Sequence, residues 1–319
     1  MLVLNMQKFV LKDDLEKITV LIPMYNAAKT VEKCVRSVLK QTYKNLDIVV
    51  VDDGSNDNSY EIVKHLADED KRIRLFHKEN EKSLAKTREY LLGKVTTEYF
   101  VFVDSDDIVK KKYIEHLYHA MVKYGADCVA SGFKINGIVP FSSIFAGTKV
   151  INDDDILSTV ILGKTIHYVV WNKMYKMSII RQMKLDTNVN FGEDFVLCYN
   201  YFHLCKKVVF INRYDYKYIL TKGSMIHSKF SNGNVVFLDW LEKTAASEQV
   251  AKNKQALYAW IAFTSASFKY LMKKSKYHKD EVLTARLNEN IRKYNDDFVK
   301  NKFSSKIFKL AYRFTKGIK

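Results

Sequence analysis

Three carboxylates that directly follow a short apolar run are the most chemically suggestive group in this 319-residue chain. Residues 99–103 (Tyr-Phe-Val-Phe-Val) are aromatic or β-branched and predict a buried strand. Asp104, Asp106 and Asp107 come next. Two carboxylates at i and i+2 on a loop can face one hard cation beside substrate phosphates, which is one interpretation. The other is an acidic turn that caps a helix beginning near Lys110.

Polar residues also follow two earlier predicted strands. The apolar run 18–22 ends in residues 23–26 (Pro-Met-Tyr-Asn), and the run 46–51 ends in residues 52–55 (Asp-Asp-Gly-Ser). Helices alternate with these strands, a pattern typical of βαβ units and a mostly parallel sheet. Right-handed crossovers then bring the loops after strands one, two and four to the same edge of the sheet. The sequence therefore predicts a single crevice that collects these polar loops.

The other predicted elements continue this α/β pattern as far as about residue 220. Strands are expected near 73–76 and 128–133, with two short strands near 208–212 and 216–219. Helices are expected at 28–40, after 57, near 83–93, at 110–123, after 153, and from about 193 to 204. From about residue 231 the pattern changes to long helices with apolar stripes.

Composition limits the class of protein. The chain is 47% hydrophobic, with 20 Tyr, 19 Phe and only 2 Pro, which indicates a large core in one or two domains and excludes a disordered protein. The four cysteines form no Cys-x-x-Cys pair, so neither a zinc site nor a disulfide framework is expected. No apolar run reaches about 18 residues, and the first residues lack the features of a signal peptide. We therefore expect a cytoplasmic protein.

The net charge of +16 favours an anionic partner, such as a phosphorylated substrate, an anionic membrane or nucleic acid. Residues 300–319 contain lysine and arginine but no acidic residue, and their apolar residues can share one helical face. This basic amphipathic helix has three interpretations. It could be a solvated surface, a peripheral attachment to an anionic membrane surface, or, least favoured, a nucleic-acid contact.

Four stretches in register resemble the family 2 glycosyltransferases. They are residues 22–26 (Ile-Pro-Met-Tyr-Asn), 37–43 (Ser-Val-Leu-Lys-Gln-Thr-Tyr), 51–59 (Val-Asp-Asp-Gly-Ser-Asn-Asp-Asn-Ser) and 102–107 (Phe-Val-Asp-Ser-Asp-Asp). Asn-Lys-Met-Tyr at 172–175 and Glu193-Asp194 extend the likeness to about residue 220. The resemblance implies a GT-A fold, which is Rossmann-like, and an inverting enzyme that uses nucleotide-activated sugars.

The resemblance divides the chain as follows. Residues 1–225 would form the catalytic domain, with a nucleotide-sugar-binding half at 17–133 and an acceptor-side half at 134–225. Residues 226–319 would form a C-terminal helical region that ends in the basic helix.

On the donor side, the resemblance assigns the nucleotide sugar to residues in three loops and one helix. Asp53 would accept the uracil N3–H and Tyr25 would stack on the base, although residues 52–55 also suit a tight turn in which Gly54 has a positive φ. Asp106, with Asp104, would bind Mn²⁺ or Mg²⁺. The residues expected to bind the nucleotide sugar are Pro23, Tyr25, Asn26, Asp52, Asp53, Arg88, Asp104 and Ser105.

On the acceptor side, Asp194 would act as the general base beside Glu193; helix capping is the alternative. The segment around Arg88 departs from the family pattern, because Glu81-Lys82 replaces the usual Gly-rich start. A solvated helix face is therefore the alternative for Arg88. His227 resembles a histidine near the metal or phosphates, or is an exposed loop residue. Trp171 and Lys173 would line the acceptor side, although Trp171 also suits the core.

These expectations combine into one function and two rivals. A divalent metal would assist transfer of one hexose or N-acetylhexosamine from a UDP-sugar to a glycan, lipid-linked or glycoprotein acceptor. No Gln-x-x-Arg-Trp motif of processive synthases is present. One rival is a nucleotidyltransferase, but residues 23–26 are not a Gly-rich basic loop. The other is a sugar-nucleotide or nucleic-acid binding protein with a vestigial site. Nucleic acid is not the expected partner, and a homo-oligomer stays open.

Overall fold

The computed structural model describes residues 16–139, 147–163, 165–220, 230–272, 277 and 279–300. The strands within them are β1 (Ile18–Met24), β2 (Leu46–Asp52), β3 (Ile73–His77), β4 (Tyr99–Phe102), β5 (Ile108–Val109), β6 (Cys128–Ile135), β7 (Lys149–Asn152), β8 (Lys173–Lys176) and β9 (Lys207–Tyr218). The helices are α1 (Val31–Leu39), α2 (Ser59–Glu69), α3 (Leu84–Leu92), α4 (Tyr113–Tyr124), α5 (Asp154–Ile161), α6 (Met177–Ile180), α7 (Glu193–His203), α8 (Asn232–Ser247), α9 (Ala251–Met272) and α10 (Glu281–Lys300).

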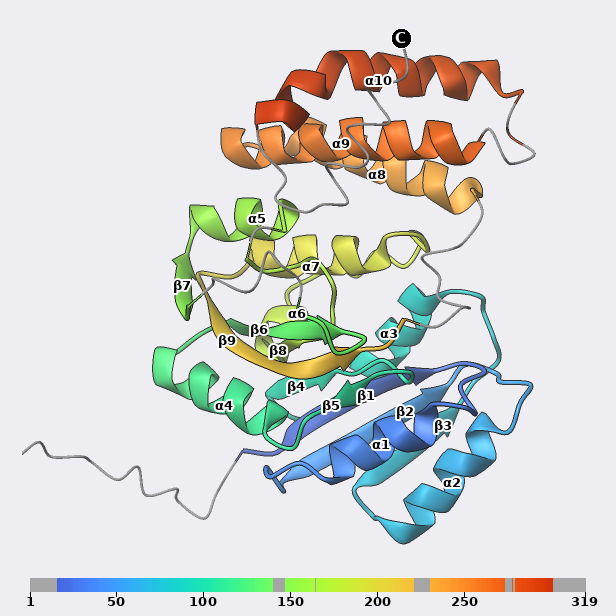
Figure 1. Ribbon diagram of the computed structural model, residues 1–319, viewed down its shortest axis with the longest axis vertical. Helices are drawn as coiled ribbons and strands as arrows, with labels where there is room; N and C mark the ends of the chain where they lie inside the picture. Colours follow the sequence, from blue (N-terminus) through green and yellow to red (C-terminus); the bar gives the residue numbers. More distant parts are fainter. Residues whose placement is uncertain are drawn as a thin grey trace, which may run out of the picture.

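The described strands form one sheet in the order β3-β2-β1-β4-β8-β6-β9-β5, with β7 paired to β9 (Figure 1). Strands β1 to β4 are parallel to one another, as predicted. Every residue of β1 and β2 is buried, which explains why their sequences are mostly apolar rather than alternating. The loops after β1, β2 and β4 therefore share one edge of the sheet.

The second half of the sheet is more mixed than the sequence pattern predicted. Strand β8 lies antiparallel between β4 and β6, while β6 and β9 are parallel. The two strands expected near 208–212 and 216–219 are one strand, β9, whose pairing with β6 shifts register next to Gly132. Strand β5 is only two residues long and was not predicted. It starts directly after Asp107 and pairs with the end of β9, which holds the Asp104 loop against the sheet.

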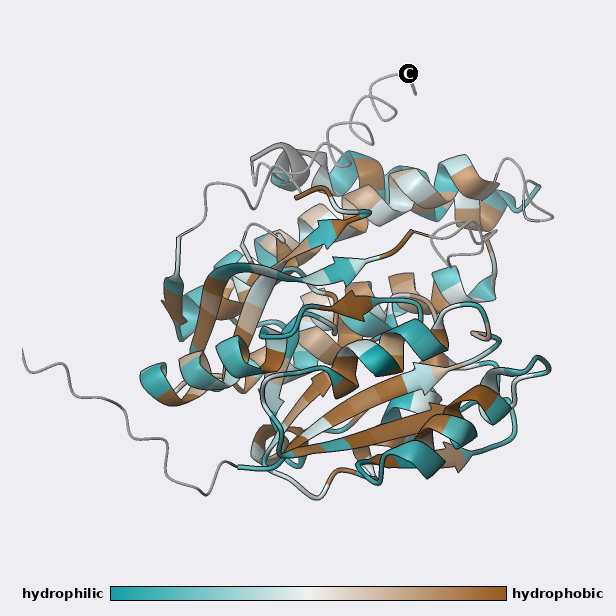
Figure 2. Ribbon diagram, turned by 60° about the horizontal axis from the view of Figure 1, so that its bottom comes forward, coloured by the Kyte–Doolittle hydropathy of each residue, from teal (hydrophilic) through white to brown (hydrophobic). Residues whose placement is uncertain are grey.

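Hydrophobic cores lie on both faces of the sheet. One includes residues of α1, α2 and α4, and the other includes residues of α3, α5, α7, α8 and α9. Figure 1 shows α5 and α7 between the sheet and the layer formed by α8, α9 and α10. In Figure 2 the central strands are largely hydrophobic, whereas the helices alternate between hydrophobic and hydrophilic residues along their length. This pattern is the one expected of a buried sheet covered by amphipathic helices.

The C-terminal helices are part of the second core, and they reach the residue that precedes α7. Gly192 has a φ of 76°, and a Cβ built there would lie 2.8 Å from the ring of Phe237 in α8. Phe237 also meets Phe191 and Phe195 edge to face, with ring centroids 5.9 and 5.8 Å apart. The start of α7, with Glu193 and Asp194, is thus packed against α8. Among the described helices, none is long and apolar enough to cross a membrane.

Candidate active site

The loops after β1 and β2 are joined by their own polar groups. The Asp53 amide donates to the Met24 carbonyl at 2.8 Å. The Asn26 amide donates to Ser55 Oγ at 2.9 Å, and the Asn56 amide donates to Asn26 Oδ1 at 2.8 Å. Asn26 has a positive φ of 48°, a conformation that asparagine tolerates better than most residues. These contacts hold the predicted donor loops together as one structure.

The Asp104 loop is fixed from two sides. Cys34 of α1 donates its Sγ–H to the Asp104 carbonyl at 3.3 Å. On the other side, the Tyr216 hydroxyl accepts a hydrogen bond from the Asp104 amide at 3.2 Å and donates to Asp107 Oδ2 at 2.6 Å. The Ile219 amide donates to Asp107 Oδ1 at 2.8 Å. Asp107 therefore anchors the loop, while the backbone positions of Asp104 and Asp106 are set by elements far apart in sequence.

Arg88 lies at the centre of a cluster of carboxylates from three segments. Its Nη1 is 2.9 Å from Glu193 Oε1 and 2.5 Å from Asp194 Oδ1, and its Nη2 is 3.8 Å from Asp104 Oδ1. The Arg88 side chain is only 3% exposed, so the alternative of a solvated helix face is wrong. Burial alone would lower the pKa of Arg88, but attraction from these carboxylates raises it overall. The guanidinium is therefore a permanent positive charge that joins the predicted donor and acceptor sides.

One arginine does not balance the negative charge around it. Burial, together with the charges of neighbouring carboxylates, raises the pKa of Asp104 to about 7, although Arg88 opposes the shift and 24% of the Asp104 side chain is exposed. Burial and the Asp104 charge raise the pKa of Asp107 to about 8 despite its two hydrogen bonds. Burial also raises the pKa of Asp106. These shifts indicate that burial disfavours the ionised forms of the three carboxyl groups of the loop.

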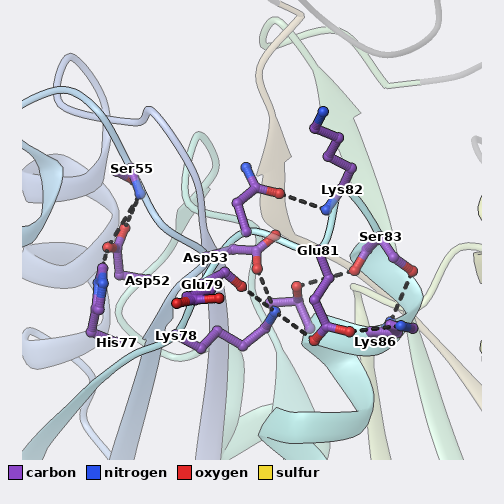
Figure 3. A network of polar contacts seen from close by, with 12 residues as sticks. Asp52, Asp53, Ser55, His77, Lys78, Glu79, Glu81, Lys82, Ser83 and Lys86 are labelled. Carbon is purple, nitrogen blue, oxygen red and sulfur yellow. Dashed lines mark hydrogen bonds and ion pairs between the residues drawn. The ribbon is translucent and has the colours of Figure 1, made fainter.

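The carboxylates of the Asp52–Asp53 turn are already paired. Asp52 is buried and its Oδ2 lies 2.8 Å from His77 Nδ1, while its carboxylate also faces the Ser55 amide. Asp53 Oδ1 forms an ion pair with Lys78 Nζ at 2.6 Å, and the same ammonium reaches Glu81 Oε1 at 3.1 Å. Figure 3 shows Lys78 between the two carboxylates. The base-binding aspartate expected from the sequence thus faces a lysine that the sequence analysis did not single out.

Gly54 makes the close approach of this turn possible. Its φ is 67°, and a Cβ at this position would be 2.8 Å from the Asn80 backbone nitrogen. The tight-turn interpretation of residues 52–55 therefore holds for Gly54. It does not compete with a binding role for Asp53, because the Asp53 carboxylate projects from the turn toward Lys78. Tyr25, on the facing loop, is 48% exposed, an arrangement that leaves its ring free to stack on a base.

Asp194 also has a backbone partner. Its Oδ2 accepts a hydrogen bond from the Val170 amide at 3.2 Å. Both Glu193 and Asp194 belong to the first turn of α7, so they also have the position expected of helix-capping carboxylates. The two interpretations are compatible, since carboxylates in the first turn of a helix can favour its positive end and pair with Arg88 at the same time.

Trp171 has the core position given as its alternative, whereas Lys173, expected on the acceptor side, is also buried. Trp171 is 5% exposed and stacks on Tyr216 and Tyr218 at centroid distances of 4.8 and 5.1 Å. Lys173 is fully buried and donates to the Val169 carbonyl at 2.7 Å and to Asn172 Oδ1 at 2.9 Å. Burial lowers the pKa of Lys173. Strand β8 thus places Lys173 inside the core, and Trp171, two residues before β8, is buried beside the aromatic residues of β9.

Two predicted features fall outside the described residues, namely His227 and the basic helix at 300–319. Conversely, the structure identifies Asp107, Tyr216 and Lys78 as parts of the site beyond those expected. Asp107 could have been suspected from its place beside Asp106. Tyr216 and Lys78 carry no local signal, because each acts on a residue that the fold brings near from a distant segment.

The donor set near Asp104 suits a hard divalent cation. Among the described residues, no group of three or more His, Cys, Asp or Glu is arranged to hold a metal by itself. Mg²⁺ and Mn²⁺, however, are often bound by one or two carboxylates plus substrate phosphates. Among the described residues, the ion-pair partner of Asp104 is Arg88 at 3.8 Å, and burial disfavours the ionised form of the Asp104 carboxyl group, which a bound cation would stabilise. Asp104 and Asp106 therefore fit a metal that is completed by a bound diphosphate.

Comparison with known proteins gives consistent results. The model of the family "Glycosyl transferase family 2" matches residues 19–185, more than half of the chain. Glycosyltransferase GlyG of Streptococcus pneumoniae is 31% identical over 67% of this chain and 74% of its own length. Glycosyltransferase GlyA of the same organism is 33% identical over 66% of this chain, but the chain spans only 31% of GlyA.

A solved structure, S. aureus TarS 1–349 in complex with UDP-GlcNAc, shares the fold with a TM-score of 0.68 at 18% identity. The alignment covers 93% of this chain and 91% of that one. With the strand order described above, this similarity identifies the fold as the GT-A type. The family match and the alignment with GlyG show that this chain belongs to glycosyltransferase family 2.

Proposed function

We propose that this protein transfers a single hexose or N-acetylhexosamine from a UDP-sugar to a hydroxyl group of an acceptor, with inversion at the anomeric carbon. The observation that carries the proposal is the Arg88 cluster, which joins Asp104 of the donor loop to Glu193 and Asp194 of α7. In a transfer reaction, the leaving group and the general base must both lie close to the sugar that is transferred. Arg88 contacts residues assigned to both.

The donor would bind along the edge formed by the first three loops. Uracil N3–H would donate to Asp53, and the base would lie against the exposed ring of Tyr25. Pro23, Asn26 and Asp52 would shape this pocket, and Asp104 with Ser105 would face the sugar and diphosphate. That TarS was solved with UDP-GlcNAc supports UDP as the nucleotide.

The chemistry assigned to α7 is deprotonation of the acceptor. Asp194 would take the proton of the acceptor hydroxyl as its oxygen forms a bond to the anomeric carbon, while the bond from that carbon to the diphosphate oxygen breaks on the opposite face. Arg88 would orient the Asp194 carboxylate through their ion pair at 2.5 Å. Glu193 would also pair with Arg88 and offset part of its positive charge, so that the Asp194 carboxylate can still accept the proton.

Asp104 and Asp106 would hold Mn²⁺ or Mg²⁺. Among the described residues, five carboxylates surround this region (Asp104, Asp106, Asp107, Glu193 and Asp194), whereas Arg88 supplies one positive charge. A diphosphate would add further negative charge, and a divalent cation would neutralise the charge on the departing nucleoside diphosphate. This imbalance supports metal dependence.

The acceptor would be a glycan, a lipid-linked oligosaccharide or a glycoprotein in the synthesis of cell-surface glycans. Among the relatives, a Borreliella burgdorferi protein 27% identical over 76% of this chain is named cholesterol galactosyltransferase, so at least one similar protein is named for a lipid acceptor. The reaction would take place in the cytoplasm, at the inner face of the membrane when the acceptor is anchored there.

The test is calorimetric titration of UDP into the protein with Mn²⁺ and with EDTA, followed by a screen of UDP-sugars for hydrolysis. We expect metal-dependent UDP binding that Asp106→Asn abolishes. Asp68→Asn, a substitution of an exposed aspartate on α2, is the matched control and should leave binding unchanged. Absence of UDP binding, with GDP and dTDP tested alongside, would contradict the donor assignment. Binding without any hydrolysis or transfer would favour the rival, a binding protein with a vestigial site.

A further inference from the structure

A cationic cavity lies outside the proposed active site, between α1 and the segment that joins β5 to α4. Its volume is about 690 Å³, within the range of about 300–1,000 Å³ typical of ligand pockets. Figure 1 shows α1 beside β5, with α4 continuing from that segment. Lys33, Arg36 and Lys40 line it from α1 and its end, and Lys110, Lys111 and Lys112 line it from the opposite side. We call this cavity the α1–α4 groove.

The positive charge of the groove is only partly neutralised. Arg36 pairs with Glu32 at 2.8 Å and with Glu69 at 3.5 Å. Asp215, an acidic residue in the lining, lies 2.7 Å from His116 Nδ1 and 3.6 Å from Lys110 Nζ. The remaining cations, Lys33, Lys40, Lys111 and Lys112, form no ion pair with any described residue. Four lysines therefore offer their charges to a ligand.

The walls of the groove are fixed to each other. Gln41 Nε2 donates to the Lys110 carbonyl at 2.8 Å, and its Oε1 accepts from the Ile114 amide at 3.1 Å. The Thr42 amide donates to the Lys111 carbonyl at 2.8 Å, and the Val109 amide donates to Ser37 Oγ at 3.1 Å. A ligand would therefore meet a preorganised cavity rather than a loose surface.

The chemistry of the lining favours phosphate groups. The unpaired cations are all lysines, which bind phosphate as point charges. The N-terminus of the twelve-residue helix α4 begins at the groove, with Lys112 as its N-cap, and adds the positive end of a helix dipole. Because cations line both walls of a cavity much larger than one phosphate, the arrangement suits a linear chain with repeated negative charges.

The groove adjoins the proposed active site. Ile108 and Val109 form part of its lining and directly follow Asp107. Cys34, next to Lys33 in α1, contacts the Asp104 carbonyl. None of the large exposed hydrophobic side chains of the described residues lines the groove, so these residues offer it no such side chain for insertion into a bilayer. These observations favour a polymer over a membrane surface.

We propose that the α1–α4 groove binds a phosphodiester-linked segment of the acceptor, a chain of polyol or sugar units joined by phosphates. This inference rests on the proposed transfer function, since it names the class of acceptor. The groove would hold the chain by its charges while another unit of the same chain reaches Asp194.

The test uses the full chain and a fluorescent oligomer of glycerol phosphate, titrated at several salt concentrations. The groove variant carries Lys33→Gln, Lys111→Gln and Lys112→Gln. The matched control loses the same charge at three exposed lysines away from the groove, through Lys71→Gln, Lys184→Gln and Lys206→Gln. We expect the groove variant to bind at least ~10-fold more weakly and to lose about 2 from the slope of log affinity against log salt. The control should stay within about twofold of wild type.

Three results would overturn the proposal. The first is equal loss in the groove and control variants, which would mean non-specific attraction. The second is single-stranded DNA with the same number of phosphates binding at least ~10-fold tighter than the oligomer, which would indicate a nucleic-acid site. The third is binding to phosphatidylglycerol vesicles but not to the soluble oligomer. UDP binding with Mn²⁺ is measured in the same samples, so failure of the donor site is distinguished from failure of the groove.

Discussion

The Asp52–Asp53 turn and the Asp104–Asp107 loop lie at the same edge of the sheet, separated by the loop after β1, yet they treat their carboxylates differently. In the turn, Asp52 faces His77 and Asp53 faces Lys78. In the loop, burial raises the pKa values of the carboxyl groups, and the nearest cation, Arg88, is shared with Glu193 and Asp194. Among the described residues, Asp53 has an ion-pair partner at 2.6 Å, whereas the partner of Asp104 lies 3.8 Å away; we call the turn the balanced side and the loop the unbalanced side of this comparison.

This difference fits the two parts of a nucleotide sugar. A balanced turn suits an uncharged base, which is recognised by hydrogen bonds. A loop with surplus negative charge suits a metal ion and the diphosphate that completes its coordination. The contrast therefore separates residues whose substitution should affect nucleotide affinity from residues whose substitution should affect the chemical step, and the following variants test it in order of expected effect.

The largest effect is expected for Asp194→Asn. Loss of a general base typically costs about 10²–10⁴-fold, so we expect kcat for transfer to fall by up to ~10⁴-fold while UDP affinity stays within about threefold. Initial rates with a labelled UDP-sugar and calorimetry measure the two quantities. Glu193→Gln is the matched comparison, since Glu193 also pairs with Arg88. A larger loss of kcat in Glu193→Gln would reverse the roles of the two residues.

Next comes Asp106→Asn, on the unbalanced side of the comparison. Charge stabilisation by a metal contributes several kcal/mol, so transfer should fall by about 10³-fold and the response of UDP binding to Mn²⁺ should disappear. Asp107→Asn is the control, because the Asp107 carboxylate is held by Tyr216 and Ile219 and is expected to anchor the loop. The assignment of the metal to Asp106 is contradicted if Asp106→Asn retains Mn²⁺-dependent UDP binding, or if only Asp107→Asn abolishes this binding.

On the balanced side, Lys78→Met should raise KM for the UDP-sugar by about tenfold and leave kcat unchanged. Once uracil N3–H donates to Asp53, the neighbouring ammonium can donate to a uracil carbonyl, a charge-assisted hydrogen bond worth about 1.5–3 kcal/mol. Lys86→Met is the control, since Lys86 pairs with Glu81 at 2.6 Å and does not contact Asp53. A lower KM in Lys78→Met would instead indicate that Lys78 competes with uracil for the Asp53 carboxylate.

The smallest effect is expected for His77→Ala. Its ring lies 2.8 Å from the fully buried Asp52, but the imidazole itself is half exposed, so the free energy of unfolding should fall by only about 1 kcal/mol. Urea denaturation measures this change. Activity per folded molecule should remain within about twofold of wild type. A change in kcat of ~10-fold or more would instead group His77 with the residues that affect the chemical step.

The sequence predicted the arrangement of the loops expected to bind the donor well because its information there is local. The strands before each loop are continuous apolar runs, and the parallel connections then determine where the loops meet. The same logic located Glu193 and Asp194 at the start of a helix. What it could not settle was the environment of Arg88, whose partners Glu193 and Asp194 are more than a hundred residues away and whose helix also suits an exposed face.

The fold of the acceptor half was predicted less well, because the pairing of its strands overrides the local sequence pattern. The sequence analysis expected one strand near 208–212 and another near 216–219, yet β9 is continuous and its pairing with β6 shifts register next to Gly132. Strand β8 buries Lys173, and only its contacts with Val169 and Asn172 explain how a lysine can lie there. Such compensation depends on tertiary neighbours, which residue types alone do not specify.

The contact between Gly192 and Phe237 has a consequence for protein engineering. Gly192 precedes the acidic pair of α7, and the aromatic ring that occupies the space beside it belongs to α8. A shortened chain that stops near residue 225 would leave this space unfilled and expose the aromatic rings around it to water. A chimera that exchanges the C-terminal helices for those of another protein would need to provide a ring at the same place, or the segment bearing Asp194 would lose its support.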